Sequence, residues 1–290
     1  MTSMSDTAPF KPRAPKGEPV YRHRVITRIS HWINVLCLSV LLMSGLNIFN
    51  AHPHLYWGQY GANFDKPVME MVVDQAPDGS SVGVTRIGGH TFKTMGLFGA
   101  SKYKGEWQAR GFPGWMTLPS YQDLATGRHW HFFFAWLFVL NGLVYLVHTV
   151  WSGHLKKDLL PREGELKPRA LLLDVWNHIR LKHPTGEAAK RYNPLQKLAY
   201  LGVIFLLLPL MILTGLTMSP GFNAIAPVLL DIFGGRQSAR TLHFITANLL
   251  LLFVLVHLIE VLIAGVWNEV RSMITGWYVA QTEPKIGEPS

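Results

Sequence analysis

Four histidines in strongly apolar stretches are the residues of this chain best suited to chemistry: His31, His131, His243 and His257. The first three share one local pattern, in which an arginine, two further residues, a histidine and an aromatic residue follow one another, at residues 28–32, 128–132 and 240–244. Ionisable side chains inside a membrane segment are costly and mark functional sites. Histidine is a common haem-iron ligand, so these four predict two haem b groups, each between two imidazoles.

The apolar residues of the chain are concentrated rather than spread. The chain has 290 residues, of which 49% are hydrophobic, and a net charge of +9. Four blocks contain no Asp, Glu, Lys or Arg: residues 29–48, 129–151, 198–218 and 241–259. Each block is near the ~20 residues that cross a bilayer as a helix. The sequence therefore predicts an all-α integral membrane protein, a bundle of four transmembrane helices with a long periplasmic insertion between helices one and two.

Basic residues beside the predicted spans indicate the orientation. Six precede the first span and nine lie in the connection 152–196, whereas the connection 219–239 has only Arg236. Cytoplasmic loops carry the excess of Lys and Arg, so both termini and the middle connection are expected in the cytoplasm and loop 51–127 outside. The basic charge thus follows from topology and does not indicate nucleic-acid binding. The single cysteine, Cys37, excludes a disulfide framework, an iron–sulfur cluster ligated by this chain and covalent haem attachment.

We expect three segments along the chain. Residues 1–20 carry four prolines and are predicted to be a disordered cytoplasmic tail, residues 21–275 form the membrane domain, and residues 276–290 form a second cytoplasmic tail. Within the insertion, two alternating stretches flank Asp78-Gly79 and predict a β-hairpin. A loop of this length is expected to be functional, as a docking surface for example. Pro209 is expected to kink the third helix.

The chain also shows signs of an internal duplication. Residues 131–135 match residues 243–247 at an offset of 112, and Met-Ser-Gly-Leu at 43–46 matches Leu-Thr-Gly-Leu at 213–216 at an offset of 170. The first unit has about 58 more residues between these signatures, 86 against 28. A duplicated two-helix unit would have lost two of six histidines, since Leu201 matches His31 and Tyr145 matches His257.

Helical geometry assigns the histidines to pairs. Residues fourteen apart on a helix are separated by about 21 Å along its axis and lie on nearly the same face. Helix four would therefore present His243 near the outer surface and His257 near the inner one. His131 opens helix two on the outer side and His31 opens helix one on the inner side, which predicts an outer pair with His243 and an inner pair with His257. His129 competes with His131, but the match to His243 favours His131.

Three arginines each lie three residues before one of the expected haem-ligating histidines: Arg28, Arg128 and Arg240. This spacing places each guanidinium one turn nearer the surface on the same face, where it could bind a haem propionate. Interfacial anchoring of the helices is the alternative explanation. For the histidines, the alternative is a proton relay or ion site, which does not require two paired levels.

A quinone site is expected beside the inner pair. Asn193, Gln196 and Tyr200 are spaced to share one face at the start of helix three, and Glu260 follows His257 by three residues and could carry protons. Two alternatives remain open: Asn193, which precedes a proline, could cap the helix, and Glu260 could pair with an interfacial base.

In the placement of His31, His131, His243 and His257, the chain resembles the bacterial cytochrome b561 superfamily. This superfamily includes cytochrome b subunits of nickel–iron hydrogenases, formate dehydrogenases and thiosulfate reductase. It is most similar to thiosulfate reductase-like members, at residues 44–53, 128–132, 234–241 and 272–277. The resemblance covers about residues 21–275 apart from the insertion. It implies an inner-membrane dihaem cytochrome that passes electrons between the quinone pool and a periplasmic redox subunit of molybdopterin, iron–sulfur or hydrogenase type.

Two other functions stay open from the sequence. One is a stand-alone transmembrane oxidoreductase that passes quinol electrons to external ferric ion or oxygen species. The other is a membrane anchor without electron flow.

Overall fold

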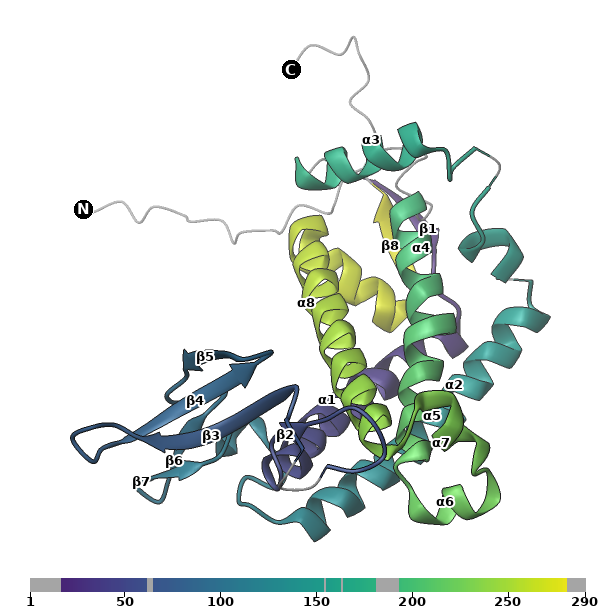
Figure 1. The fold of residues 1–290 in the computed structure, drawn as a ribbon. Coiled ribbons are helices and arrows are strands. Elements are labelled where there is room, and N and C mark those ends of the chain that lie inside the picture. Colours follow the sequence, from purple (N-terminus) through teal and green to yellow (C-terminus); the bar gives the residue numbers. More distant parts are fainter. Residues whose placement is uncertain (1–16, 62–64, 154, 163, 181–192, 281–290) are drawn as a thin grey trace, which may run out of the picture.

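The computed structural model describes residues 17–61, 65–153, 155–162, 164–180 and 193–280. Within these ranges, four helices are long and apolar enough to cross a membrane: α1 (Val25–Asn50), α2 (Leu124–Trp151), α4 to α5 (Pro194–Thr217) and α8 (Arg236–Thr275). Helix α1 packs chiefly against α2, and α5 packs against α8, so the bundle consists of two helical hairpins (Figure 1). This confirms the prediction of a helical protein with four candidate spans.

The third span is interrupted at its proline. Helix α4 (Pro194–Gly202) leads into a π-helical turn (Val203–Leu207) and then into α5 (Leu208–Thr217). Pro209 has no amide hydrogen, and its ring would clash with the carbonyl group four residues earlier in a regular helix. The wider turn lies just before Pro209 and accommodates the ring.

The fourth span is longer than predicted. Helix α8 has 40 residues and is broken at Gly265, whose φ of 104° and ψ of 88° are not helical. After the break the chain turns back, and β8 (Trp277–Ala280) pairs antiparallel with β1 (Glu18–Tyr21). Strands therefore lie inside both segments expected to be tails. The rest of those tails, residues 1–16 and 281–290, lies outside the described residues.

The insertion carries β structure that corrects the all-α prediction. Four strands form an antiparallel sheet, in the order β2 (His54–Leu55), β3 (Met69–Gln75), β4 (Ser81–Ile87) and β5 (His90–Lys93). A separate hairpin follows, made of β6 (Ala100–Tyr103) and β7 (Glu106–Ala109), and then a short 3-10 helix, η1 (Gly114–Met116). The predicted hairpin is confirmed as β3–β4, with Asp78 accepting hydrogen bonds from the Ser80 amide and hydroxyl groups. The other strands form because a polar segment of this length satisfies its backbone groups by pairing.

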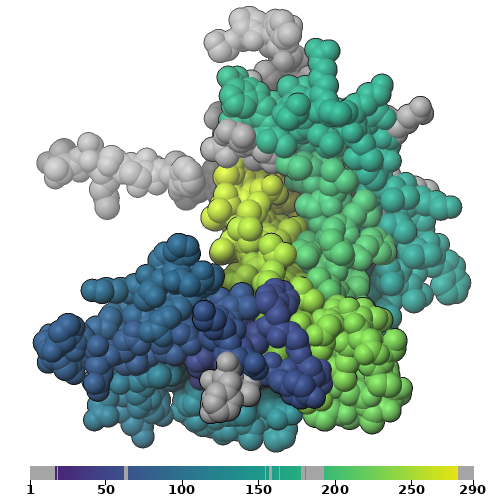
Figure 2. Space-filling view, in the orientation of Figure 1, coloured from purple at the N-terminus to yellow at the C-terminus, as the bar shows by residue number. Residues whose placement is uncertain are grey.

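The sheet lies at one end of the bundle and the β1–β8 pair lies towards the other (Figure 1). We call these ends the insertion side and the termini side. Shorter elements complete the described chain: a π-helical turn (Leu155–Leu159), α3 (Pro168–Ile179), α6 (Pro220–Ile225) and α7 (Val228–Phe233). The space-filling view shows the sheet packed directly against the bundle, with no gap between them on this face (Figure 2).

Buried asparagines of α1 attach the insertion to the bundle. The Asn50 side chain donates to the Phe112 carbonyl oxygen (2.8 Å) and accepts from the Phe112 amide (2.9 Å). One turn earlier, Asn47 donates to the carbonyl oxygens of Pro119 (2.7 Å) and Tyr121 (2.8 Å). Both asparagines are buried, so these bonds act as fixed links between helix α1 and the insertion.

A loop of the insertion also closes over the first turn of α8. The amide groups of Gln237 and Ser238 donate to the carbonyl oxygen of Gly58 (3.0 and 3.1 Å), and the Arg236 amide donates to the Gln59 side chain (3.0 Å). The first amides of a helix have no acceptor within it. The loop supplies those acceptors and ties the insertion to the helix that carries two of the four histidines.

We expect Asn50→Ala to loosen the insertion from the bundle. The substitution leaves the buried amide and carbonyl groups of Phe112 unpaired, at a cost of about 1–3 kcal/mol. Limited proteolysis in detergent should cut the insertion of this variant faster than that of the parent protein. Asn248→Ala is the control, since that exposed side chain donates only to a carbonyl of its own helix. Equal cleavage of parent and Asn50→Ala would contradict the anchoring role.

Two facing histidine pairs

The four histidines lie in two pairs between helices. The rings of His131 on α2 and His243 on α8 have centroids 6.3 Å apart, and those of His31 on α1 and His257 on α8 have centroids 6.5 Å apart. The interplanar angles are 60° and 65°. Helix α8 thus contributes one ring to each pair, as the topology predicts. His129 is exposed on α2, and its neighbour His131 is the residue that faces α8.

The spacing of the rings fits a metal held between two imidazoles. A metal–imidazole bond is about 2.0–2.1 Å long, and a ring nitrogen lies about 1.1 Å from its centroid, so a shared metal places the centroids about 6.3 Å apart. Each pair supplies only two ligands, and the described residues contain no cluster of three His, Cys, Asp or Glu side chains that could hold a metal ion. A porphyrin supplies the remaining four ligands, so the residues present fit bis-imidazole haem.

Hydroxyl groups contact both imidazoles of the insertion-side pair. The Oγ of Ser44 lies 3.0 Å from Nδ1 of His131, and the Oγ1 of Thr214 lies 3.0 Å from Nδ1 of His243. Both hydroxyl residues are completely buried. Each contact lies within one hairpin, α1 to α2 in the first case and α5 to α8 in the second.

A glycine follows each of these hydroxyl residues, and each glycine lies against the same imidazole. A Cβ atom built on Gly45 would lie 3.4 Å from Cε1 of His131, and one built on Gly215 would lie 3.4 Å from Cε1 of His243. A Cβ atom at that distance would touch the ring in van der Waals contact, so each glycine lies directly against its imidazole and leaves no room for a bulkier side chain between helix and ring. The repeated Ser/Thr-Gly signature is therefore a structural part of the insertion-side pair.

The termini-side pair has aromatic neighbours instead. The Trp32 ring lies edge-on to His31 at 5.3 Å, and the Phe253 ring stacks on His257 at 6.2 Å with an interplanar angle of 10°. The Nδ1 atom of His31 is buried and has no hydrogen-bond partner in the part of the chain that the structure describes. The two pairs therefore share their spacing and differ in their surroundings.

Two of the three arginines form contacts to the carbonyl groups of other segments. Arg28 donates to the Ile274 carbonyl oxygen in the last turn of α8. Arg240 donates to the His52 carbonyl oxygen, and its guanidinium lies 5.7 Å from the centroid of Phe49. A guanidinium has five donors, so these contacts leave donors for a further acceptor near each pair.

The third arginine is exposed. Arg128 lies over the Phe132 ring on α2, with its guanidinium 5.6 Å from the ring centroid. All three arginines precede their histidine by one helical turn.

The residues expected at a quinone site fall into two groups. Asn193 and Gln196 form a capping box at the start of α4, where Asn193 Oδ1 accepts from the Gln196 amide (2.7 Å) and Gln196 Oε1 accepts from the Asn193 amide (3.4 Å). The helix cap that the sequence left open as an alternative is therefore present.

Tyr200 belongs to the second group and approaches the termini-side pair. Its ring lies edge-on to Phe253 at 6.3 Å, and Phe253 stacks on His257. Glu260 lies on α8 three residues after His257 and is half-buried. Phe253 therefore contacts both Tyr200 and His257.

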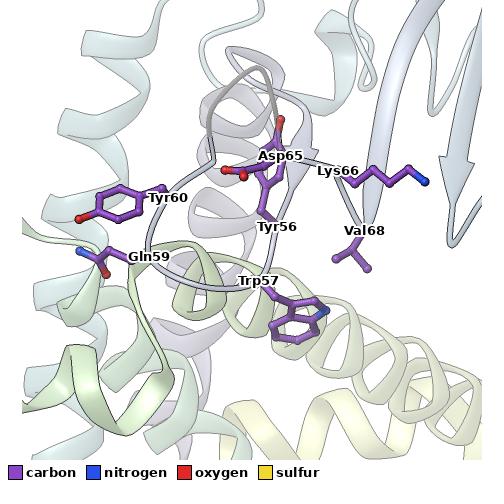
Figure 3. A pocket seen from close by; sticks show the side chains of 7 residues that line it. All are labelled: Tyr56, Trp57, Gln59, Tyr60, Asp65, Lys66 and Val68. Atoms are coloured by element: carbon purple, nitrogen blue, oxygen red, sulfur yellow. The ribbon is translucent and has the colours of Figure 1, made fainter.

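A pocket on the insertion side lies beside the first turn of α8 (Figure 3). The Trp57 and Tyr60 side chains at this pocket are 53% and 78% exposed. Its lining comes from one stretch of the insertion: Tyr56, Trp57, Gln59, Tyr60, Asp65, Lys66 and Val68. The pocket brings aromatic and charged side chains close to the helix that carries His243.

Comparison with known proteins agrees with this architecture. The chain is 26% identical over 249 residues to a protein of Azospira oryzae named as a protein-methionine-sulfoxide reductase subunit, YedZ1, with 86% of this chain and 93% of that protein covered. No solved structure matches the chain. The sequence model described as prokaryotic cytochrome b561 matches residues 22–276. The chain therefore belongs to the prokaryotic cytochrome b561 family of membrane electron-transfer proteins.

Proposed function

We propose that the chain is a dihaem cytochrome b of the bacterial inner membrane that carries electrons between the quinone pool and a periplasmic oxidoreductase. The observation that carries this proposal is the presence of two imidazole pairs with metal-compatible spacing at two depths of one bundle. Bound haem b supplies reversible one-electron chemistry at each pair. The histidines would hold it, and Arg28, Arg128 and Arg240 would bind its propionates.

The name of the Azospira oryzae relative supports an outward direction of electron flow. Reduction of a sulfoxide takes up two electrons and two protons and releases a thioether and water, and oxidation of a quinol releases two electrons and two protons. We propose that this chain serves as the membrane subunit of a periplasmic reductase, of the molybdopterin type that the family resemblance implies. Both termini would then lie in the cytoplasm and the insertion in the periplasm.

Single histidine substitutions should remove the haems one at a time. We expect His243→Leu to lose the insertion-side haem and His257→Leu to lose the termini-side haem, so a pyridine haemochrome assay should fall from about two b haems per chain to about one. His129→Leu is the matched control and should keep both. Absence of haem from the folded parent protein would refute the proposal. A pure membrane anchor would keep partner-linked activity in both leucine variants.

We place partner docking on the insertion side, at the pocket beside α8. The hydroxyl of Thr241 donates to the Tyr56 carbonyl oxygen (2.6 Å), which links the pocket to the turn that precedes His243. Exposed aromatic residues are typical anchors of protein interfaces. We expect Trp57→Ala with Tyr60→Ala to lower partner-linked quinol oxidation more than 10-fold, a loss of about 1.4 kcal/mol or more, with haem content unchanged. Phe92→Ala, an exposed aromatic on β5, is the control, and an equal effect there would contradict this docking site.

We propose that quinone binds beside the termini-side pair, with Tyr200 and Glu260 nearest to the quinone ring. Asn193 and Gln196 would border the site, where they cap the start of α4. A photoreactive quinone analogue should label α4 near Tyr200, and Tyr200→Phe should weaken labelling severalfold. An apolar groove lies elsewhere on this side, lined by Val25, Arg28, Ile29, Trp32, Ile33, Leu36, Met273 and Ile274. Labelling of that groove instead of α4 would overturn the assignment.

A further inference from the structure

The two hydroxyl groups beside the insertion-side pair each have a backbone acceptor for their own proton, one turn earlier on the same helix. The Ser44 hydroxyl donates to the Val40 carbonyl oxygen (2.7 Å), and the Thr214 hydroxyl donates to the Leu210 carbonyl oxygen (2.6 Å). A hydroxyl group has a single proton. When that proton points to the carbonyl oxygen, the lone pairs of the hydroxyl remain for Nδ1 of the neighbouring imidazole, which then donates. The carbonyl groups of Leu41 and Met211, which accept from His131 and His243, favour this direction.

This hydrogen-bond direction selects one tautomer of each ring. When Nδ1 of His131 and of His243 carries a hydrogen, Nε2 keeps the free lone pair that a metal requires. The glycine after each hydroxyl residue leaves space for the ring beside the helix. Each hairpin thus orients its own imidazole through contacts within that hairpin.

We infer that Ser44 and Thr214 are positioning residues that hold both ligands of the insertion-side haem in the Nδ1–H tautomer and make this haem electronically different from the other. The inference rests on the proposed haem function. For the termini-side pair, the structure gives no equivalent hydroxyl bond, and Nδ1 of His31 is unpartnered among the described residues.

The effect of these hydrogen bonds on the reduction potential of the haem has a defined direction. A hydroxyl oxygen that accepts from Nδ1–H draws the proton away from the ring and makes the imidazole a stronger electron donor. Stronger donation stabilises ferric over ferrous iron and lowers the reduction potential of the haem. Removal of either hydroxyl should therefore raise the potential of the insertion-side haem and leave that of the termini-side haem unchanged.

The test is a spectroelectrochemical titration of the detergent-purified holoprotein. We expect Ser44→Ala and Thr214→Ala each to shift one of the two potentials upwards, and the double variant to shift that same potential further. We expect the His257→Leu variant to keep only the insertion-side haem. Combining it with either alanine substitution therefore shows whether the shifted potential belongs to that haem. The conservative variants Ser44→Thr and Thr214→Ser should retain the parent potentials, because a hydroxyl group remains.

Two matched controls distinguish the effect of losing the hydroxyl–imidazole hydrogen bond from the effect of removing any hydroxyl group from a helix. Ser39 donates to the Val35 carbonyl oxygen (2.7 Å) and Thr217 donates to the Leu213 carbonyl oxygen (2.8 Å), with the same spacing along the helix. Within the described part of the chain, neither hydroxyl bonds to an imidazole. Their alanine variants should leave both potentials unchanged. Unchanged potentials in the Ser44/Thr214 double variant, or equal shifts in the controls, would overturn the inference while the dihaem function stands. A parent protein without haem would instead refute the function itself.

Discussion

The structure depends on one constraint: a single helix must present two imidazoles, at two depths, to two different neighbouring helices. In lipid, apolar helices gain little hydrophobic stabilisation from touching one another, so close packing and interhelical hydrogen bonds hold the bundle together. Several of its most deeply buried side chains are accordingly polar or small, among them Asn47, Ser44 and Thr214. Ser44 and Thr214 join neighbouring helices, and Asn47 joins α1 to the insertion.

The insertion contributes to the same requirement from outside the bundle. It accepts hydrogen bonds from the first amides of α8, and two asparagine side chains of α1 hydrogen-bond to its backbone. The ends of α1 and α8 on this side are therefore fixed, close to His131 and His243. Because the insertion and the insertion-side histidine pair share these supports, the two lie close together without a flexible connection between them.

The spans and the histidine pairing could be predicted because their signals are strong and local. Apolar length marks a span, and the separation of His243 from His257 places both on one face of an uninterrupted helix. The β6–β7 hairpin was missed because its strands have only four residues each, although Lys104-Gly105, with φ of 51° and 89°, is a typical tight-turn pair. The β1–β8 pair joins distant segments and has no local signal. The Ser-Gly and Thr-Gly repeats were visible, but only the structure shows that they contact His131 and His243.

The shared use of α8 also imposes an order on assembly. It is the last of the four spans to leave the ribosome, and each pair takes one imidazole from it. During synthesis, His31 and His131 are each present as single rings, and a two-ligand site appears only when the final helix has entered the membrane. A chain cut short before α8 would offer no complete pair. Cofactor loading would then act as a test that the whole polypeptide had been made and inserted.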